Sequence, residues 1–172
     1  MLKTAGICLI LIGGTGLGFC QSYAITRRAK AMEMLIRMTI LLKAEIRCGN
    51  ASLHDAFCEA AAKLPGEYGE FLGEAAERMQ NPSGRRFGEI FRECAEEKLA
   101  HLRLSKEEQE KLYALGGYLG YLDLEMQMKQ LELYEQELQN SLEALRAEMP
   151  AKKKVYQSLG IFGGILLAVL VW

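Results

Sequence analysis

The chain has 172 residues, with 22 acidic and 21 basic residues and a net charge of −1. This mixed, near-neutral balance gives no indication of the concentrated basic face of a nucleic-acid-binding protein, so no nucleic acid is expected as a partner. All acidic residues, and every basic residue except Lys3, lie between two apolar stretches, 4–20 and 155–172. We therefore expect a polar middle large enough for its own core, with an apolar segment at each end.

The first apolar segment runs to Ile25, close to the roughly 20 residues that a helix needs to cross a membrane. Its pair Gly14 and Gly18 has a spacing that permits close contact between helices, and a glycine-rich anchor without a partner is equally consistent. A cleaved signal peptide is the alternative, because Lys3 precedes an apolar core. No small-x-small cleavage site ends the segment, and a transmembrane helix is predicted over residues 4–25.

Helical periodicity follows in the polar middle. Apolar residues recur on one stripe from Arg27 to Arg47, and no Gly or Pro interrupts residues 21–48, so the first helix is expected to continue into this one. Ser52 can cap a short helix that Pro65-Gly66 ends. Two more helices are predicted over 67–80 and 85–101, and the capping box Ser105-x-x-Glu108 opens another that reaches Leu115. Gly116-Gly117 is expected to break or bend it.

A long helix is predicted from about Tyr118 to Glu148, because Leu131, Leu138 and Leu145 repeat every seven residues, as in a coiled coil. Pro150 and the lysines 152–154 are expected to separate it from the last apolar segment. That segment, 155–172, is just long enough to span a membrane and has Tyr156 and Trp172 near its ends. A helix buried in a protein core is the alternative.

The basic residues that flank the apolar segments predict an orientation. Arg27, Arg28 and Lys30 follow the first segment, and Lys152–Lys154 precede the second. Lysine and arginine near membrane segments are retained on the cytoplasmic side. The fold class predicted is therefore all-α: a cytoplasmic bundle of about five to six helices, residues 26–154, flanked by two transmembrane helices.

A search for chemistry finds no catalytic, cofactor-binding or metal-binding set. His54 and His101 lack partners at metal-site spacing, and His54-Asp55 before Cys58 is better explained by helix capping. No glycine-rich phosphate loop follows a strand. The acidic runs 107–110 and 132–137 are predicted to be solvated, with the docking of a basic partner as a second use. The sequence predicts a protein that is not an enzyme.

An ordered set of short motifs resembles the stage III sporulation protein AB family of endospore-forming bacteria over essentially the whole chain. The set consists of Met1-Leu2-Lys3, Leu42-x-x-Glu45-Ile46-x-x-Gly49, Leu53-His54-x-Ala56, Gly116-x-x-Leu119-Gly120-x-x-Asp123-x-x-x-Gln127 and Ser158-Leu159-Gly160. That family is similar in turn to the cytoplasmic helical domain of the type II secretion inner-membrane platform protein. That platform protein has two such domains and more membrane segments, whereas this chain has one domain and two apolar segments.

The resemblance implies a subunit of a channel-like complex between mother cell and forespore, seated in the mother-cell membrane and docking the cytoplasmic ATPase of the complex. Other membrane subunits, and further copies of the chain, are additional expected partners. The candidate contact residues are Glu45, Gly49 and Leu53 at one turn and Gly116, Gly120, Asp123 and Gln127 at another. The alternative for these residues is that they only shape the turns. The alternative for the protein is a membrane-tethered helical sensor that binds a ligand.

Overall fold

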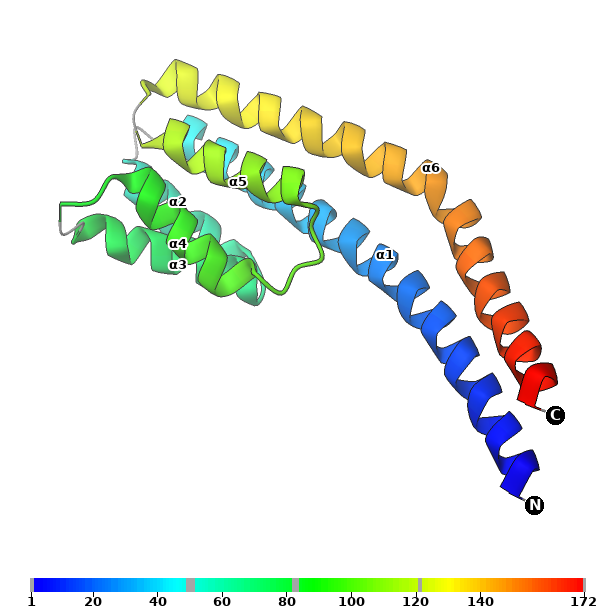
Figure 1. Cartoon of the computed structure of the whole chain (residues 1–172). Helices are drawn as coiled ribbons and strands as arrows, with labels where there is room; N and C mark the ends of the chain where they lie inside the picture. Colours follow the sequence, from blue (N-terminus) through cyan, green and yellow to red (C-terminus); the bar gives the residue numbers. More distant parts are fainter. Residues whose placement is uncertain (1, 49–51, 82–83, 121, 172) are drawn as a thin grey trace. The chain divides into compact units, whose positions relative to one another are not determined.

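The structure is a computed structural model that describes residues 2–48, 52–81, 84–120 and 122–171, without most of the side chains of residues 2–21 and 153–171. The described residues form six α-helices and no strand, so the predicted all-α class is confirmed (Figure 1). The helices are α1 (Leu2–Cys48), α2 (Leu53–Lys63), α3 (Glu67–Gln80), α4 (Phe87–Leu99), α5 (Lys106–Leu119) and α6 (Leu124–Val171).

The helix limits follow from local sequence, with two corrections. As predicted, α1 continues without a break from the apolar segment into the amphipathic stretch. At Gly116-Gly117, where a break or a bend was expected, there is no break, because α5 runs through both glycines to Leu119. However, α6 begins at Leu124 instead of Tyr118, because α5 keeps Tyr118 and Asp123 caps the next helix by accepting the Met126 N–H at 2.9 Å.

Pro150 does not end the helix, so the predicted separation of the last apolar segment is wrong: α6 includes Pro150 and continues to Val171. A proline removes one backbone donor and crowds one carbonyl, which bends a helix without always ending it. Ala147 and Glu148 before it and Ala151 and Lys152 after it are strong helix formers.

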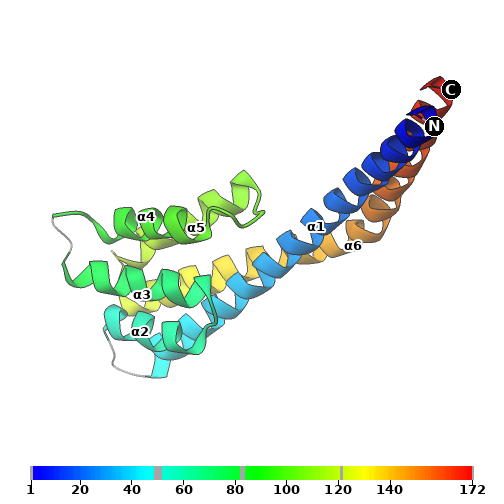
Figure 2. The ribbon, with the colours of Figure 1, turned by 90° about the horizontal axis from the view of Figure 1, so that it is seen from below.

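The chain divides into two compact units, which we name the helical domain (residues 30–142) and the terminal unit (residues 1–29 and 143–172). The helical domain lies within the predicted range 26–154. In it, α2 packs on α3, α3 on α4, and α4 on α5, so each short helix contacts the next one along the chain (Figures 1 and 2).

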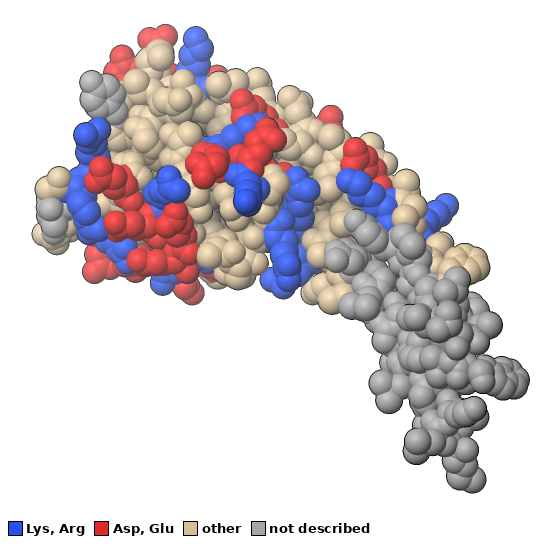
Figure 3. Space-filling view, in the orientation of Figure 1, with Lys and Arg blue, Asp and Glu red and all other residues tan. Residues whose placement is uncertain are grey.

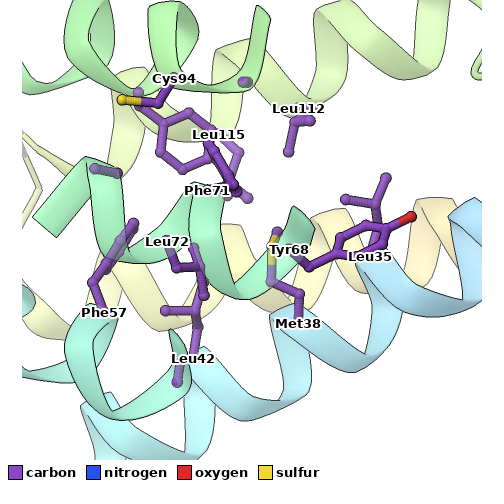
Figure 4. Close-up of a cluster of buried hydrophobic side chains, with 14 of the residues drawn as sticks. Leu35, Met38, Leu42, Phe57, Tyr68, Phe71, Leu72, Cys94, Leu112 and Leu115 are labelled. Atoms are coloured by element: carbon purple, nitrogen blue, oxygen red, sulfur yellow. The ribbon is translucent and has the colours of Figure 1, made fainter. Parts of the chain in front are cut away.

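One core fills the helical domain, and all six helices contribute to it. In Figure 4, Leu35, Met38 and Leu42 of α1 point toward α3, and side chains of α2, α4 and α5 close the cluster. Four phenylalanines meet edge to face: Phe71 and Phe91 have ring centroids 5.0 Å apart, and Phe57 and Phe87 5.5 Å apart. On α6, Leu131 and Leu138 join the core, which confirms the apolar face predicted from the seven-residue repeat.

Within the part of the chain that the structure describes, no helix is both long enough and apolar enough to cross a membrane. The backbone of the segments 4–25 and 155–171 is helical, and the structure does not describe most of their side chains.

Candidate partner-binding surface

The first candidate turn joins α1 to α2. Glu45 is half-buried and forms an ion pair with Lys63, in which its Oε1 lies 2.6 Å from the lysine Nζ. The carboxylate therefore links the end of α1 to the end of α2. Leu53 is half-buried and packs on the core, directly after the Ser52 cap. Gly49 lies outside the described residues. Both described candidates therefore have a structural role, which fits the alternative that they shape the turn.

Two candidate glycines lie where α5 crosses α4 at close range. A Cβ on Gly116 would lie 2.3 Å from Cδ1 of Phe91, and a Cβ on Gly120 would lie 2.5 Å from Cβ of Phe87. Gly88 on α4 is equally constrained, because its Cβ would lie 2.8 Å from Cα of Gly117. These glycines let the two helix backbones approach each other and seat the phenylalanine rings in the core.

Asp123 and Gln127 organise the connection from α5 to α6. Asp123 caps α6, and the Gln127 side-chain amide donates to the carbonyls of Leu119 at 2.7 Å and Leu122 at 2.9 Å. These bonds satisfy the Leu119 carbonyl at the end of α5, which has no helical partner, and the Leu122 carbonyl in the connection. The structure thus brings Gly116, Gly120, Asp123 and Gln127 together in one corner, whose shape they maintain.

The exposed residues of this corner were not singled out by the sequence. Tyr118 is 48% exposed, Leu124 59% and Met126 40%, and all three lie between Gly116 and Gln127. We name residues 116–127 the α5–α6 corner. Three large, exposed apolar side chains within nine residues of the chain, on either side of the connection from α5 to α6, are typical of a contact surface. The only signal in the sequence was their position between two of the candidate residues, Gly116 and Gln127.

Two hollows adjoin the α5–α6 corner. One of 240 Å³ lies between α5 and α6 and includes Tyr118, Leu133 and the ion pair of Lys111 with Glu137. The other, of 430 Å³, lies beside the close crossing of α4 and α5 and includes Phe87, Gly117 and Gly120.

The predicted solvation of the acidic runs needs correction at two positions. Glu108 is only 4% exposed, because its carboxylate accepts the Ser105 N–H at 2.7 Å as the partner of the predicted capping box. Glu135 is half-buried and pairs with Lys43 of α1 at 2.5 Å. In the visible face of the helical domain, acidic and basic groups interleave, with one acidic patch (Figure 3).

An ion-pair network crosses from α3 to α4. Arg78 binds Glu97 at 2.6 Å and Glu74 at 2.8 Å. The hydrogen bond between Arg78 and Glu97 holds the pKa of the Glu97 carboxyl below its usual value. Cys94 of α4 is buried, and this burial raises the pKa of its thiol. Exposed pairs of this kind contribute little stability each, so their main effect is on the charge pattern of the surface.

The histidines take part in local hydrogen bonds. His54 Nδ1 lies 3.2 Å from Asp55, and its Nε2 lies 2.9 Å from the Gln80 amide nitrogen and 3.6 Å from Cys58. Asp55 also binds the Ser52 hydroxyl at 2.7 Å, as the predicted helix cap requires. Among the described residues, no group of three or more His, Cys, Asp or Glu side chains could hold a metal ion.

The described residues define a small all-α protein in which four short helices follow one another along the chain between two long ones. The chain belongs to the stage III sporulation protein AB family, whose sequence model matches residues 3–172. The resemblance found in the sequence motifs is thereby confirmed.

A solved structure of stage III sporulation protein AB has the same fold. It superposes with a TM-score of 0.62 and 22% sequence identity, covering 72% of this chain and 96% of the solved one. At this identity the likeness is evidence for the fold alone. No curated protein matches the sequence.

Proposed function

We propose that this protein is a non-enzymatic platform subunit of the stage III sporulation complex, a channel-like assembly between mother cell and forespore. In it, the helical domain docks the cytoplasmic ATPase of the complex, and the two ends bind the membrane and other membrane subunits. The observation that carries the proposal is the family match over residues 3–172, nearly the whole chain. The exposed apolar residues at one corner of a polar bundle support a docking role.

In this proposal the apolar segments 4–25 and 155–172 are anchors in the mother-cell membrane, and the helical domain lies in the cytoplasm. The support is the length and composition of both segments and the basic residues on the inner side of each.

The docking surface is tested by substitution of two exposed apolar side chains of the α5–α6 corner. Tyr118→Ser combined with Leu124→Ser is expected to reduce co-purification of the ATPase from sporulating cells by about tenfold or more, as the loss of a central apolar contact does. Ile40→Ser is the matched control, since Ile40 is 45% exposed on α1, outside the α5–α6 corner. Unchanged recruitment by the double variant, with a native circular dichroism spectrum, would refute docking at this corner.

The charged candidates need variants that separate contact from structure. Asp123→Asn keeps a good helix cap but removes the charge, whereas Asp123→Ala removes both. Lys63→Ala breaks the same ion pair as Glu45→Ala but keeps the Glu45 carboxylate. A contact role predicts that Asp123→Asn and Glu45→Ala lose ATPase recruitment while Lys63→Ala retains it. Equal effects of Glu45→Ala and Lys63→Ala would leave only the structural role.

The orientation distinguishes the platform from a sensor whose bundle faces outward. Cys58 is exposed on α2 of the helical domain, so a variant that retains it as its single cysteine reports the side on which the domain lies. We expect an impermeant thiol reagent to label Cys58 only after the cells are permeabilised. Labelling in intact cells, at the level of a denatured sample, would support the sensor.

A further inference from the structure

The two structural units have opposite charges, which the net charge of the chain conceals. The terminal unit holds seven basic residues against two acidic ones, a net charge of +5. The helical domain holds 14 basic residues against 20 acidic ones, a net charge of −6. A separation of this size concentrates positive potential on the terminal unit.

Most of the positive charge of the terminal unit lies in two short segments, one on each long helix. Arg27, Lys152 and Lys154 are exposed, and Arg28 is partly exposed. We name these four residues the basic collar. Large apolar side chains in solvent adjoin it on the side of the chain ends: Tyr23 one turn before Arg27, and Val155 directly after Lys154.

Glu148 pairs with one cation of the basic collar. Its carboxylate pairs with Lys152 at 2.5 Å. The hydrogen bond from Lys152 lowers the pKa of Glu148 most, and the charges of Lys152 and then of Arg28 lower it further. Arg28 of α1 is thus among the charges that act on this carboxylate of α6, and both basic segments belong to the same compact unit.

We propose that the basic collar binds the anionic phosphate headgroups of a lipid bilayer. Its chemistry matches that surface: cations reach phosphate oxygens, while the adjoining Tyr23 and Val155 supply apolar and aromatic groups that settle at the membrane interface. A nucleic acid would use the cations but leave these apolar groups in water. This inference rests on the proposed membrane anchoring and adds a selectivity for anionic lipid, which anchoring alone does not require.

The test uses the full chain reconstituted in vesicles of phosphatidylcholine mixed with phosphatidylglycerol. Spin-labelled analogues of each lipid report, by electron paramagnetic resonance, which lipid associates with the protein. We expect a preference of about fivefold for the phosphatidylglycerol label at low salt, since a cluster of cations attracts anionic lipid. High salt should reduce the preference toward equality through screening.

Substitutions locate the effect in the basic collar. Replacing its four cations by Gln should abolish the preference, whereas the conservative pair Arg27→Lys and Arg28→Lys should retain it. A control variant carries the same change of charge on exposed residues of the helical domain, and its preference should equal that of the wild type. The control replaces Arg47, Arg103, Lys106 and Lys129 by Gln.

The outcomes separate this inference from the proposed function. Alkaline extraction of the same vesicles reports anchoring: release of the chain would overturn both the anchoring and the basic collar. Retention without lipid preference, or a wild-type preference in the variant that lacks the collar cations, would overturn the collar alone. An equal loss of preference in the control variant would also overturn it, because net charge and not position would then explain the selectivity.

Discussion

Two neighbouring glycines of α5 are expected to respond in opposite ways to the same substitution. In Gly116→Ala the new Cβ would lie 2.3 Å from Cδ1, 2.5 Å from Cγ and 2.7 Å from Cβ of Phe91. Phe91 is fully buried, and its ring also meets those of Phe57 at 6.2 Å and Phe87 at 5.8 Å, so it has little room to move. In Gly117→Ala the new Cβ meets nothing within 4 Å.

The magnitudes follow from two opposing effects. Overpacking a core costs about 1–3 kcal/mol, and alanine in place of glycine within a helix stabilises by about 0.5–1 kcal/mol. Gly116→Ala should therefore destabilise the chain by about 1–2 kcal/mol, and Gly117→Ala should stabilise it by about 0.5–1 kcal/mol. The difference of about 2 kcal/mol corresponds to roughly 4–8 °C in Tm for a chain of this size.

Thermal unfolding of the full chain in detergent, followed by far-ultraviolet circular dichroism, measures both variants against the wild type. The reasoning would be refuted by a Gly116→Ala variant as stable as the wild type, or by equal shifts of both variants in one direction. Either result would mean that Gly116 does not accommodate the Phe91 ring.

Three further predictions concern caps and thiols. Ser105→Ala should lower the free energy of unfolding by about 1 kcal/mol, because it removes the acceptor for the first turn of α5; chemical denaturation measures this, and an unchanged midpoint would contradict it. The hydrogen bond from Ser52, and then that from His54, lower the pKa of the Asp55 carboxyl from its ordinary value of 3.8. The ionised carboxylate therefore stabilises the fold fully above pH 3.8, and this stabilisation is lost as the pH falls through the lowered pKa. In Asp55→Asn, the free energy of unfolding measured at a series of acidic pH values should depend less on pH than in the wild type. An unchanged pH dependence would contradict the role of the ionised carboxylate in the cap. In the native chain, exposed Cys58 should react with a maleimide at least about tenfold faster than buried Cys94. Mass spectrometry of the labelled peptides measures both rates, and equal rates would contradict the burial of Cys94.

The sequence by itself determined the helices and most of their limits, because these depend on local chemistry. The apolar period of α1 and the Ser52 and Ser105 caps each act within a few residues of the chain. The seven-residue repeat on α6 likewise predicted that Leu131 and Leu138 are buried. The motifs predicted the family, which the match over residues 3–172 confirms.

The tertiary structure alone decided what the turn residues do, because their neighbours are distant in sequence. The need for glycine at 116 comes from Phe91 on another helix, and the half-burial of Glu45 comes with its pairing to Lys63. Exposure is likewise a property of packing: Tyr118 and Leu124 are as apolar as core residues, yet they are 48% and 59% exposed. Their place in the α5–α6 corner, and not their residue type, makes them the better candidates for docking.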